Sequence, residues 1–131
     1  MDPHLELVAQ AHSRDMALRS FFDHPNPYGM QAVDRVNAVT PPFWTAVAEN
    51  IAAGLSASPL DTPADTMARW IASPGHDANI SDPNLTHIGI GAYYRTGDTQ
   101  GLYAYFTQVF ARWSEDPSAH DWLEPAEVPA P

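Results

Sequence analysis

Two segments near the C-terminal end alternate with a period of two, and they constrain the fold more than any other feature. Residues 87–94 (His-Ile-Gly-Ile-Gly-Ala-Tyr-Tyr) and 102–110 (Leu-Tyr-Ala-Tyr-Phe-Thr-Gln-Val-Phe) each predict a strand. The polar, glycine-containing residues 96–101 between them predict a hairpin loop. Phe106 lies on one face of the second strand and Tyr105 on the other. Because both faces are apolar, we expect helices packed on two sides of a small antiparallel sheet.

Helical periodicity is found upstream of these strands. Residues 4–20 carry apolar or small side chains every three or four positions, and residues 30–38 predict a second, shorter helix. The secondary structure of residues 43–54 is ambiguous. Helices followed by a short antiparallel sheet predict an α+β fold with three layers, an α-β-α sandwich.

The clearest helix start lies at Thr62-Pro63, where Thr62 can cap the first turn and Pro63 suits the first helical position. The predicted helix covers residues 62–72. It is expected to bury three large side chains: Met67, Trp70 and Ile71. Ser-Pro-Gly at 73–75 ends this helix, and residues 76–80 predict one further turn.

Charge and composition exclude several classes of function. The 131 residues fit one domain, with 16 acidic residues against six arginines, no lysine and a net charge of −10. Such a chain repels phosphate backbones and anionic membranes, so we expect no nucleic-acid binding. Without cysteine there are no disulfides, thiolate nucleophiles or cysteine-ligated metals. With no run of 18 apolar residues and no basic, apolar N-terminus, we expect neither a transmembrane segment nor a signal peptide.

The composition changes near the end of the chain. Residues 115–131 contain five acids, four prolines and no arginine, which is typical of a solvated, extended tail. The sequence therefore predicts a single folded domain over residues 1–114, followed by an acidic, proline-rich tail at 115–131.

Histidine and carboxylate side chains are the candidates for chemistry, because the standard nucleotide-binding, zinc-protease and esterase motifs are absent. His24, Glu49 and His76 can bind a zinc-like ion and leave a position for water, although ordinary loop hydrogen bonding is the alternative. Glu49 lies in an apolar stretch and, if buried, needs a partner or a raised pKa. Ser73 beside His76 is weak evidence for nucleophilic catalysis.

The four other histidines are not expected to be ligands. His12 falls on the buried stripe of the first predicted helix, and we expect it to be a hydrogen-bonded core residue rather than a ligand. His4, His87 and His120 are expected at the surface.

Six short motifs occur in an order that resembles the CAP superfamily of cysteine-rich secretory, antigen five and pathogenesis-related proteins. The likeness is greatest to the short, cysteine-free bacterial branch called SCP-like, and it covers roughly residues 5–113. The motifs are Ala-x-x-His-Ser-x-Asp-Met at 9–16, Phe-Phe-Asp-His at 21–24, Glu-Asn-Ile-Ala-Ala-Gly at 49–54, Trp-x-x-Ser-Pro-Gly-His-x-Ala-Asn-Ile at 70–80, Asp-Pro-x-x-Thr-x-Ile-Gly-Ile-Gly at 82–91 and Tyr-Phe-Thr-Gln-Val-Phe at 105–110.

The resemblance implies a central cleft lined by two histidines and two acidic residues that holds a divalent ion. His24 matches the first cleft histidine, Glu49 the glutamate and His76 the second histidine, with Ser73 beside it. The second family acid has no counterpart at residues 67–75. The implied metal ligands are therefore His24 and His76, and the implied ion is zinc or another divalent cation. The resemblance also implies that Asn50 and Asn79 fix loops through their amides.

The family's usual first helix, which precedes the segment at Leu5, has no counterpart here. Its loss would expose an apolar face and favour a homodimer. The resemblance further implies an extracellular or cell-envelope location. Three functions stay open: a module that binds a small apolar ligand, an envelope component or a protein; a metal-dependent hydrolase with Glu49 as general base; and a structural or stress-related domain with a vestigial cleft.

Overall fold

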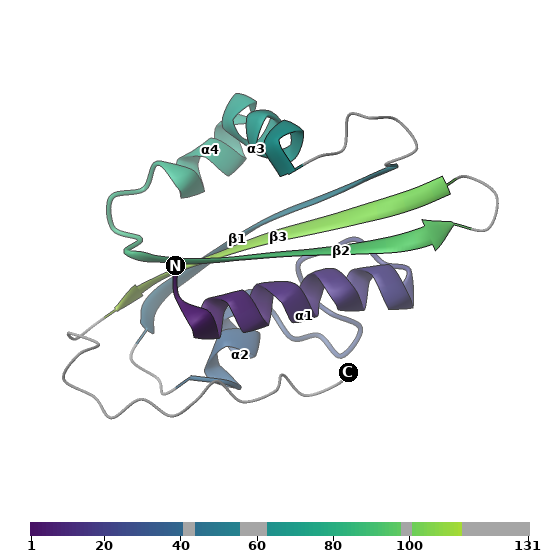
Figure 1. Cartoon of the computed structure of the whole chain (residues 1–131). Helices are drawn as coiled ribbons and strands as arrows, with labels where there is room; N and C mark the ends of the chain where they lie inside the picture. Colours follow the sequence, from purple (N-terminus) through teal and green to yellow (C-terminus); the bar gives the residue numbers. More distant parts are fainter. Residues whose placement is uncertain (41–43, 56–62, 98–100, 114–131) are drawn as a thin grey trace.

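The structure, a computed structural model, describes residues 1–40, 44–55, 63–97 and 101–113. Its elements follow the chain in this order: α1 (Pro3–Arg19), α2 (Ala32–Asn37), β1 (Trp44–Leu55), α3 (Pro63–Ala72), α4 (Pro74–Ile80), β2 (His87–Gly97) and β3 (Gly101–Trp113). Three layers are formed, with α3 and α4 above the sheet and α1 and α2 below it (Figure 1). The predicted cap at Thr62, the tip of the hairpin at 98–100 and the tail at 115–131 lie outside the described residues. None of the described helices is long and apolar enough to span a membrane.

The sheet has three antiparallel strands in the order β1-β3-β2. The predicted hairpin is confirmed, with Tyr93 opposite Tyr105 and Gly97 opposite Gly101. The segment whose secondary structure was ambiguous is β1, which pairs with β3 along its length and places Asn50 opposite Gln108. The central strand β3 therefore presents both of its faces to helices.

Apolar side chains fill the space on both sides of β3. Val109 points down and is wholly buried with Leu5 and Val8 of α1, whereas Phe106 points up and is buried with Trp70 of α3. The expectation that both faces are covered is confirmed. Burial of large side chains on two faces supplies the main stabilisation of so small a sheet.

The helix α1 lies directly against β2. Asp2 caps it, with Oδ1 accepting hydrogen bonds from the backbone N–H groups of His4 and Leu5. A Cβ at Gly89 or Gly91 would lie 2.0 or 2.3 Å from backbone atoms of α1, so these two glycines permit the close approach. His4 is only 5% exposed, which corrects its predicted surface position, because this first turn packs onto the sheet.

The upper layer consists of two short helices. The indole N–H of Trp70 donates to the carbonyl oxygen of Ile51 at 3.1 Å and directs α3 onto the sheet. Ile71 is 54% exposed, which corrects its predicted burial, because the next residue along a helix is turned about 100° away. Residues 73–75 do end α3, but Pro74 also begins α4, which is longer than the single turn expected.

Candidate functional site

Glu49 and Asn50 are neighbours on β1, and their side chains point to opposite sides of the sheet. Each of them contacts one part of the candidate site. The side chain of Glu49 points into the lower layer, where it contacts Arg35 of α2. Asn50 points into the upper layer, where its amide nitrogen donates to the backbone oxygen of His76 at 3.0 Å. The structure thus forms two pairs, His24 with Glu49 below and Ser73 with His76 above.

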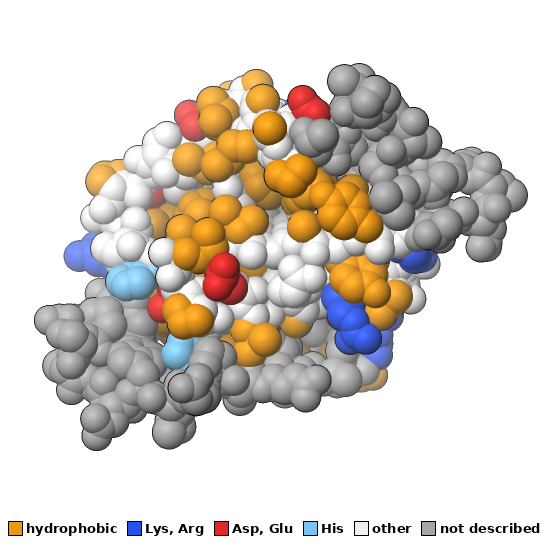
Figure 2. Space-filling model, in the orientation of Figure 1, with side chains coloured by type: hydrophobic (Ala, Val, Ile, Leu, Met, Phe, Trp, Pro, Cys, Tyr) orange, Lys and Arg blue, Asp and Glu red, His pale blue; other side chains and the backbone are white. Residues whose placement is uncertain are grey.

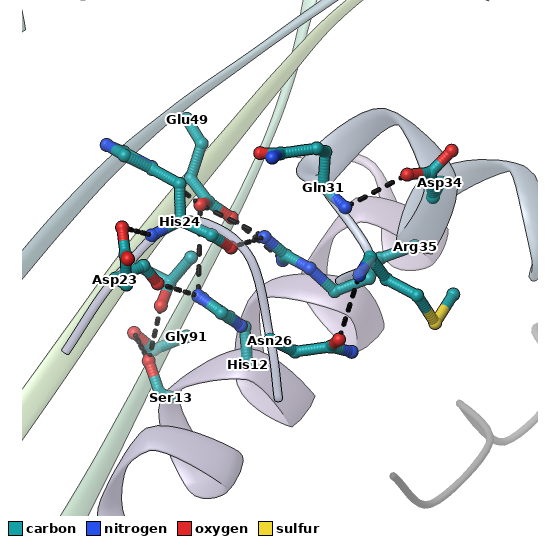
Figure 3. Close-up of polar contacts among 12 residues, drawn as sticks. His12, Ser13, Asp23, His24, Asn26, Gln31, Asp34, Arg35, Glu49 and Gly91 are labelled. Carbon is teal, nitrogen blue, oxygen red and sulfur yellow. Dashed lines mark hydrogen bonds and ion pairs between the residues drawn. The ribbon is translucent and has the colours of Figure 1, made fainter. Parts of the chain in front are cut away.

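The lower pair is part of a buried charged network (Figure 3). Arg35 donates from both terminal nitrogens to the Glu49 carboxylate, at 2.8 and 3.1 Å. His24 Nδ1 donates to Glu49 Oε1 at 2.9 Å. Arg35 also donates to the backbone oxygen of His24 at 2.8 Å, so one guanidinium holds both the carboxylate and the loop that carries the histidine. Two-point pairing of this kind fixes orientation as well as charge.

These contacts set the protonation of the network. Burial by itself raises the pKa of Glu49, but the hydrogen bonds from His24 and Arg35 outweigh it and hold that pKa below its usual value. The hydrogen bond to Glu49 is the largest influence on His24 and raises its pKa, while partial burial opposes the change. Glu49 is therefore ionised at neutral pH, and its negative charge favours the protonated form of His24.

The His24 side chain is 48% exposed, although its partner Glu49 is only 3% exposed. Because Nδ1 is directed inward to Glu49, the opposite edge of the ring, with Nε2, faces outward. A histidine held through one nitrogen by a carboxylate has a fixed tautomer and a defined direction for its other nitrogen.

His12 lies at the inner end of this network. Its Nε2 is 2.9 Å from the backbone oxygen of Asp23, and because a carbonyl only accepts, Nε2 carries the proton. Burial lowers the pKa of His12 to about 4, so it is neutral and makes no ion pair with Glu49 Oε1 at 3.8 Å. The prediction of a buried, hydrogen-bonded core histidine is confirmed.

Amide side chains hold α4 to β1 in the upper layer. Asn50 donates to Gln108 Oε1 at 3.1 Å and accepts from Asn79 of α4 at 2.9 Å. His76 Nδ1 shares a hydrogen bond of 2.8 Å with the hydroxyl of Ser73, three residues earlier. The amides of Asn50 and Asn79 therefore fix the segment that carries His76, as the resemblance implied.

Arg35 is the site residue that sequence reasoning missed. It is 3% exposed, on a helix of six residues whose short pattern does not distinguish an inward from an outward arginine. The available signal was the requirement that a buried Glu49 have a partner. The chain offers only six arginines and no lysine as cationic partners, and Arg35 lies next to the core residue Val36.

Of the candidate metal ligands, His24 and His76 are available to an ion, whereas Glu49 is not. Among the described residues, no three His, Asp or Glu side chains form a group that could hold a metal ion. Arg35 occupies both oxygens of Glu49 and places a positive charge beside them, which opposes metal binding by that carboxylate. His24 and His76 each keep Nε2 as a ligand atom, since each Nδ1 already has a hydrogen-bond partner.

The protein is therefore a three-layer α-β-α sandwich domain. Its edge strand β1 carries a glutamate that is hydrogen-bonded to a histidine. The chain belongs to the cysteine-rich secretory protein (CAP) family, whose model matches residues 1–110. It is 37% identical over 97 residues to the protein YkwD of Bacillus subtilis (strain 168), a match that covers 74% of this chain but only 35% of YkwD. The chain thus spans about a third of that relative.

A solved structure gives the same fold. An outer surface protein from Borrelia burgdorferi superposes with a TM-score of 0.66, covering 86% of this chain and 75% of that one. The two sequences are 18% identical, so this likeness supports the fold alone. The predicted α+β sandwich and the predicted family are confirmed.

Proposed function

We propose that this CAP domain acts outside the cell or in its envelope as a binding module, and that the surface around His24 contacts its ligand or partner. The observation that carries the proposal is the commitment of the Glu49 carboxylate to Arg35 and His24. An ionised carboxylate with a lowered pKa and two donors is a poor proton acceptor. The network holds His24 in place and presents its outer edge.

The residues around His24 support a contact surface. Phe22 is 54% exposed and Tyr28 is 65% exposed, and both belong to the loop that carries His24 between α1 and α2. The guanidinium of Arg19 lies 5.1 Å from the centre of the Tyr28 ring, which restrains it. Exposed aromatic rings with little freedom are typical of residues that dominate recognition.

Co-sedimentation with washed bacterial envelopes tests this function. We expect the protein to sediment with envelopes, and Phe22→Ala and His24→Ala to reduce the bound fraction at least threefold. Leu18→Ala is the matched control, because Leu18 is 51% exposed on α1 outside this loop. Equal sedimentation of all four proteins would reject the surface around His24. Envelopes stripped of protein distinguish a protein partner from another envelope component.

A divalent metal held by His24 and His76 is a second candidate. Both Nδ1 atoms have hydrogen-bond partners, an arrangement that orients Nε2 in metal-binding histidines. When bound, the ion would supply a Lewis acid. Calorimetry with zinc at neutral pH tests the candidate: micromolar binding should be lost in both His24→Ala and His76→Ala. Binding that either variant leaves unchanged would contradict a shared site.

The third alternative, a metal-dependent hydrolase with Glu49 as base, has less support. Glu49 could take up a proton near neutral pH only if Arg35 moved away from it. Because the pair is buried, that movement would leave a buried charge without a partner. A screen of activated esters with and without zinc checks this alternative, with Glu49→Gln as control. Turnover that is abolished by Glu49→Gln would favour the hydrolase over the binding module.

A further inference from the structure

The upper side of β2 carries apolar side chains that the described helices leave exposed. The register places Ile88, Ile90, Ala92 and Tyr94 on this side, opposite Phe110, Gln108, Phe106 and Ala104 of β3. Ile90 is 38% exposed and Tyr94 is 44% exposed, although the strand that carries them pairs with β3 along its whole length. Figure 2 shows hydrophobic side chains gathered across the middle of this face, over β2 and below α3 and α4.

This row continues into a cavity of about 210 Å³ beneath α4. Five apolar side chains line it: Met67, Ile80, Leu85, Ile88 and Phe110. The remaining lining residues are Asn79, Thr86, His87 and Gln108, and none is an acid or an arginine. We call the cavity together with Ile90 and Tyr94 the upper groove. His24 and Glu49 do not line it, so it is a separate surface from the candidate site.

The free edge of β2 is closed to another strand at two points. The Gln10 side chain donates to the backbone oxygen of Ala92 at 2.7 Å and accepts from its N–H at 3.0 Å. The N–H of Asp2 donates to the oxygen of Ile88 at 2.8 Å. These contacts occupy backbone groups on either side of Ile90. An added strand would have to hydrogen-bond to the N–H and C=O groups of alternate residues along this edge, and some of these groups are already occupied. A partner at this face must therefore bind through side chains.

The dimensions of the row favour a helix. From Ile88 to Tyr94 a strand extends about 20 Å, at roughly 3.3 Å per residue. A helix of about 13 residues has that length, at 1.5 Å per residue. A small molecule would cover the cavity and leave Ile90 and Tyr94 exposed.

We propose that the upper groove binds an amphipathic helix that presents an apolar stripe to the groove and lysine or arginine along its flanks. The apolar stripe matches a groove with no acid or arginine in its wall. The basic flanks match a chain with a net charge of −10. A second copy of this chain carries the same negative charge, which opposes self-association through this face.

A labelled 14-residue peptide of leucine and lysine with helical spacing, LKKLLKLLKKLLKL, tests the proposal by fluorescence anisotropy in 0.3 M salt. We expect saturable binding to the full chain, weakened at least tenfold by Ile90→Asn. Leu18→Asn is the matched control, since Leu18 is also a half-exposed apolar residue but lies on α1 in the lower layer. It should bind as the unmodified protein does. A 14-residue peptide of alternating leucine and lysine, which favours strands, should bind at least tenfold more weakly.

Three outcomes would overturn the proposal. Equal affinity of the Ile90→Asn and Leu18→Asn proteins would mean that the peptide binds by charge alone. Equal affinity of the two peptides would mean that no helix is selected. Sedimentation that shows a dimer of the peptide-free protein, dissociated by Ile90→Asn, would assign the groove to a second copy. Circular dichroism melts establish that both variants fold, so that lost binding is not lost structure.

Discussion

At the residue scale, the buried ion pair between Arg35 and Glu49 determines how the candidate site responds to substitution. Arg35→Met leaves the carboxylate buried without its main partner, so we expect a loss of about 3–5 kcal/mol in the free energy of unfolding. Arg35→Met combined with Glu49→Leu removes both charges and should recover most of that loss. Urea unfolding at pH 7 measures both effects.

An exposed arginine provides the control for this pair. Arg112 is exposed and donates to the side chain of Asn84 at 3.2 Å, so Arg112→Met should change the free energy of unfolding by less than about 0.5 kcal/mol. The variant that combines Arg35→Met with Glu49→Leu gives the opposing outcome. If it is as unstable as Arg35→Met alone, the loss arises from packing of the arginine stem rather than from an unpaired carboxylate.

His12 makes the fold sensitive to acid. Its pKa is about 4 in the folded chain and about 6.5 when unfolded, so between these values the unfolded chain binds a proton that the folded chain does not. The free energy of unfolding therefore falls as the pH decreases from 6.5 to 4, by up to about 3 kcal/mol. His12→Gln keeps a donor toward Asp23 and should flatten this dependence in urea unfolding between pH 7 and 4.5.

Three other histidine and carboxyl groups with shifted pKa values, His24, Glu49 and His87, leave the sign of this prediction unchanged. Burial raises the pKa of Asp15, which opposes the fall only in part, because it acts close to the pKa of an ordinary carboxyl. The raised pKa of His24 gives stability that is fully present below pH 6.5 and is lost only as the pH rises further. Glu49, with its lowered pKa, loses its contribution as the pH falls below about 4.5. Burial lowers the pKa of His87, which leaves a residual slope in the variant. An unchanged slope in His12→Gln would place the acid sensitivity elsewhere.

At the element scale, contact between α1 and β2 depends on two glycines. A methyl group at Gly91 would meet the backbone N–H and Cα of Gln10 at 2.3 and 2.4 Å, and a helix backbone cannot rotate away as a side chain can. We expect Gly91→Ala to lower the free energy of unfolding by about 3 kcal/mol or more, measured by urea unfolding.

Gly75 is the matched control for Gly91. It lies in α4, and a methyl group placed there would have nothing within 4 Å, so Gly75→Ala should be neutral or stabilising by up to about 1 kcal/mol. Equal losses in the two variants would contradict close packing of α1 on β2 as the cause.

Elements with strong local signals were predictable from the sequence, and those decided by pairing were not. The hairpin was predictable because alternation over β2 and β3 has no helical alternative. β1 was ambiguous because Ala48, Ala52 and Ala53 suit a helix as well as a strand, and only pairing with β3 decides between them. Ile71 was misplaced because Trp70 beside it takes the position that faces the sheet.

The candidate site shows the same division. A buried glutamate in an apolar stretch requires a partner, and the family motifs that His24 and Glu49 match placed these two residues in one cleft. Glu49 contacts His24 on one side of β1, and its neighbour Asn50 contacts the backbone of His76 on the other. This division depends on strand register, which no short motif encodes. Arg35 was missed because an arginine in a helix of six residues has no pattern that marks it as buried.

At the scale of the whole molecule, the net charge of −10 is unevenly distributed along the chain. Five of the 16 acidic residues fall in residues 115–131, which contain no arginine. Removing this segment leaves eleven acids against six arginines, a net charge of −5. Self-repulsion rises with net charge and is screened by salt, so the tail should account for much of any salt dependence of stability.

A chain ending at residue 114 tests both the predicted domain boundary and this charge effect. We expect it to unfold cooperatively, with a Tm within a few degrees of the full chain in 0.5 M sodium chloride, because every described core residue lies before residue 114. Between 10 mM and 500 mM salt its Tm should rise by well under half as much as that of the full chain, because half of the net charge has been removed and self-repulsion grows with roughly the square of that charge. Replacing the five tail acids with their amides in the full-length chain separates charge from length and should reproduce the smaller salt dependence. Loss of cooperative unfolding in the shortened chain would instead make residues 115–131 part of the folded domain, and the negative charge that they carry would then act on the core directly.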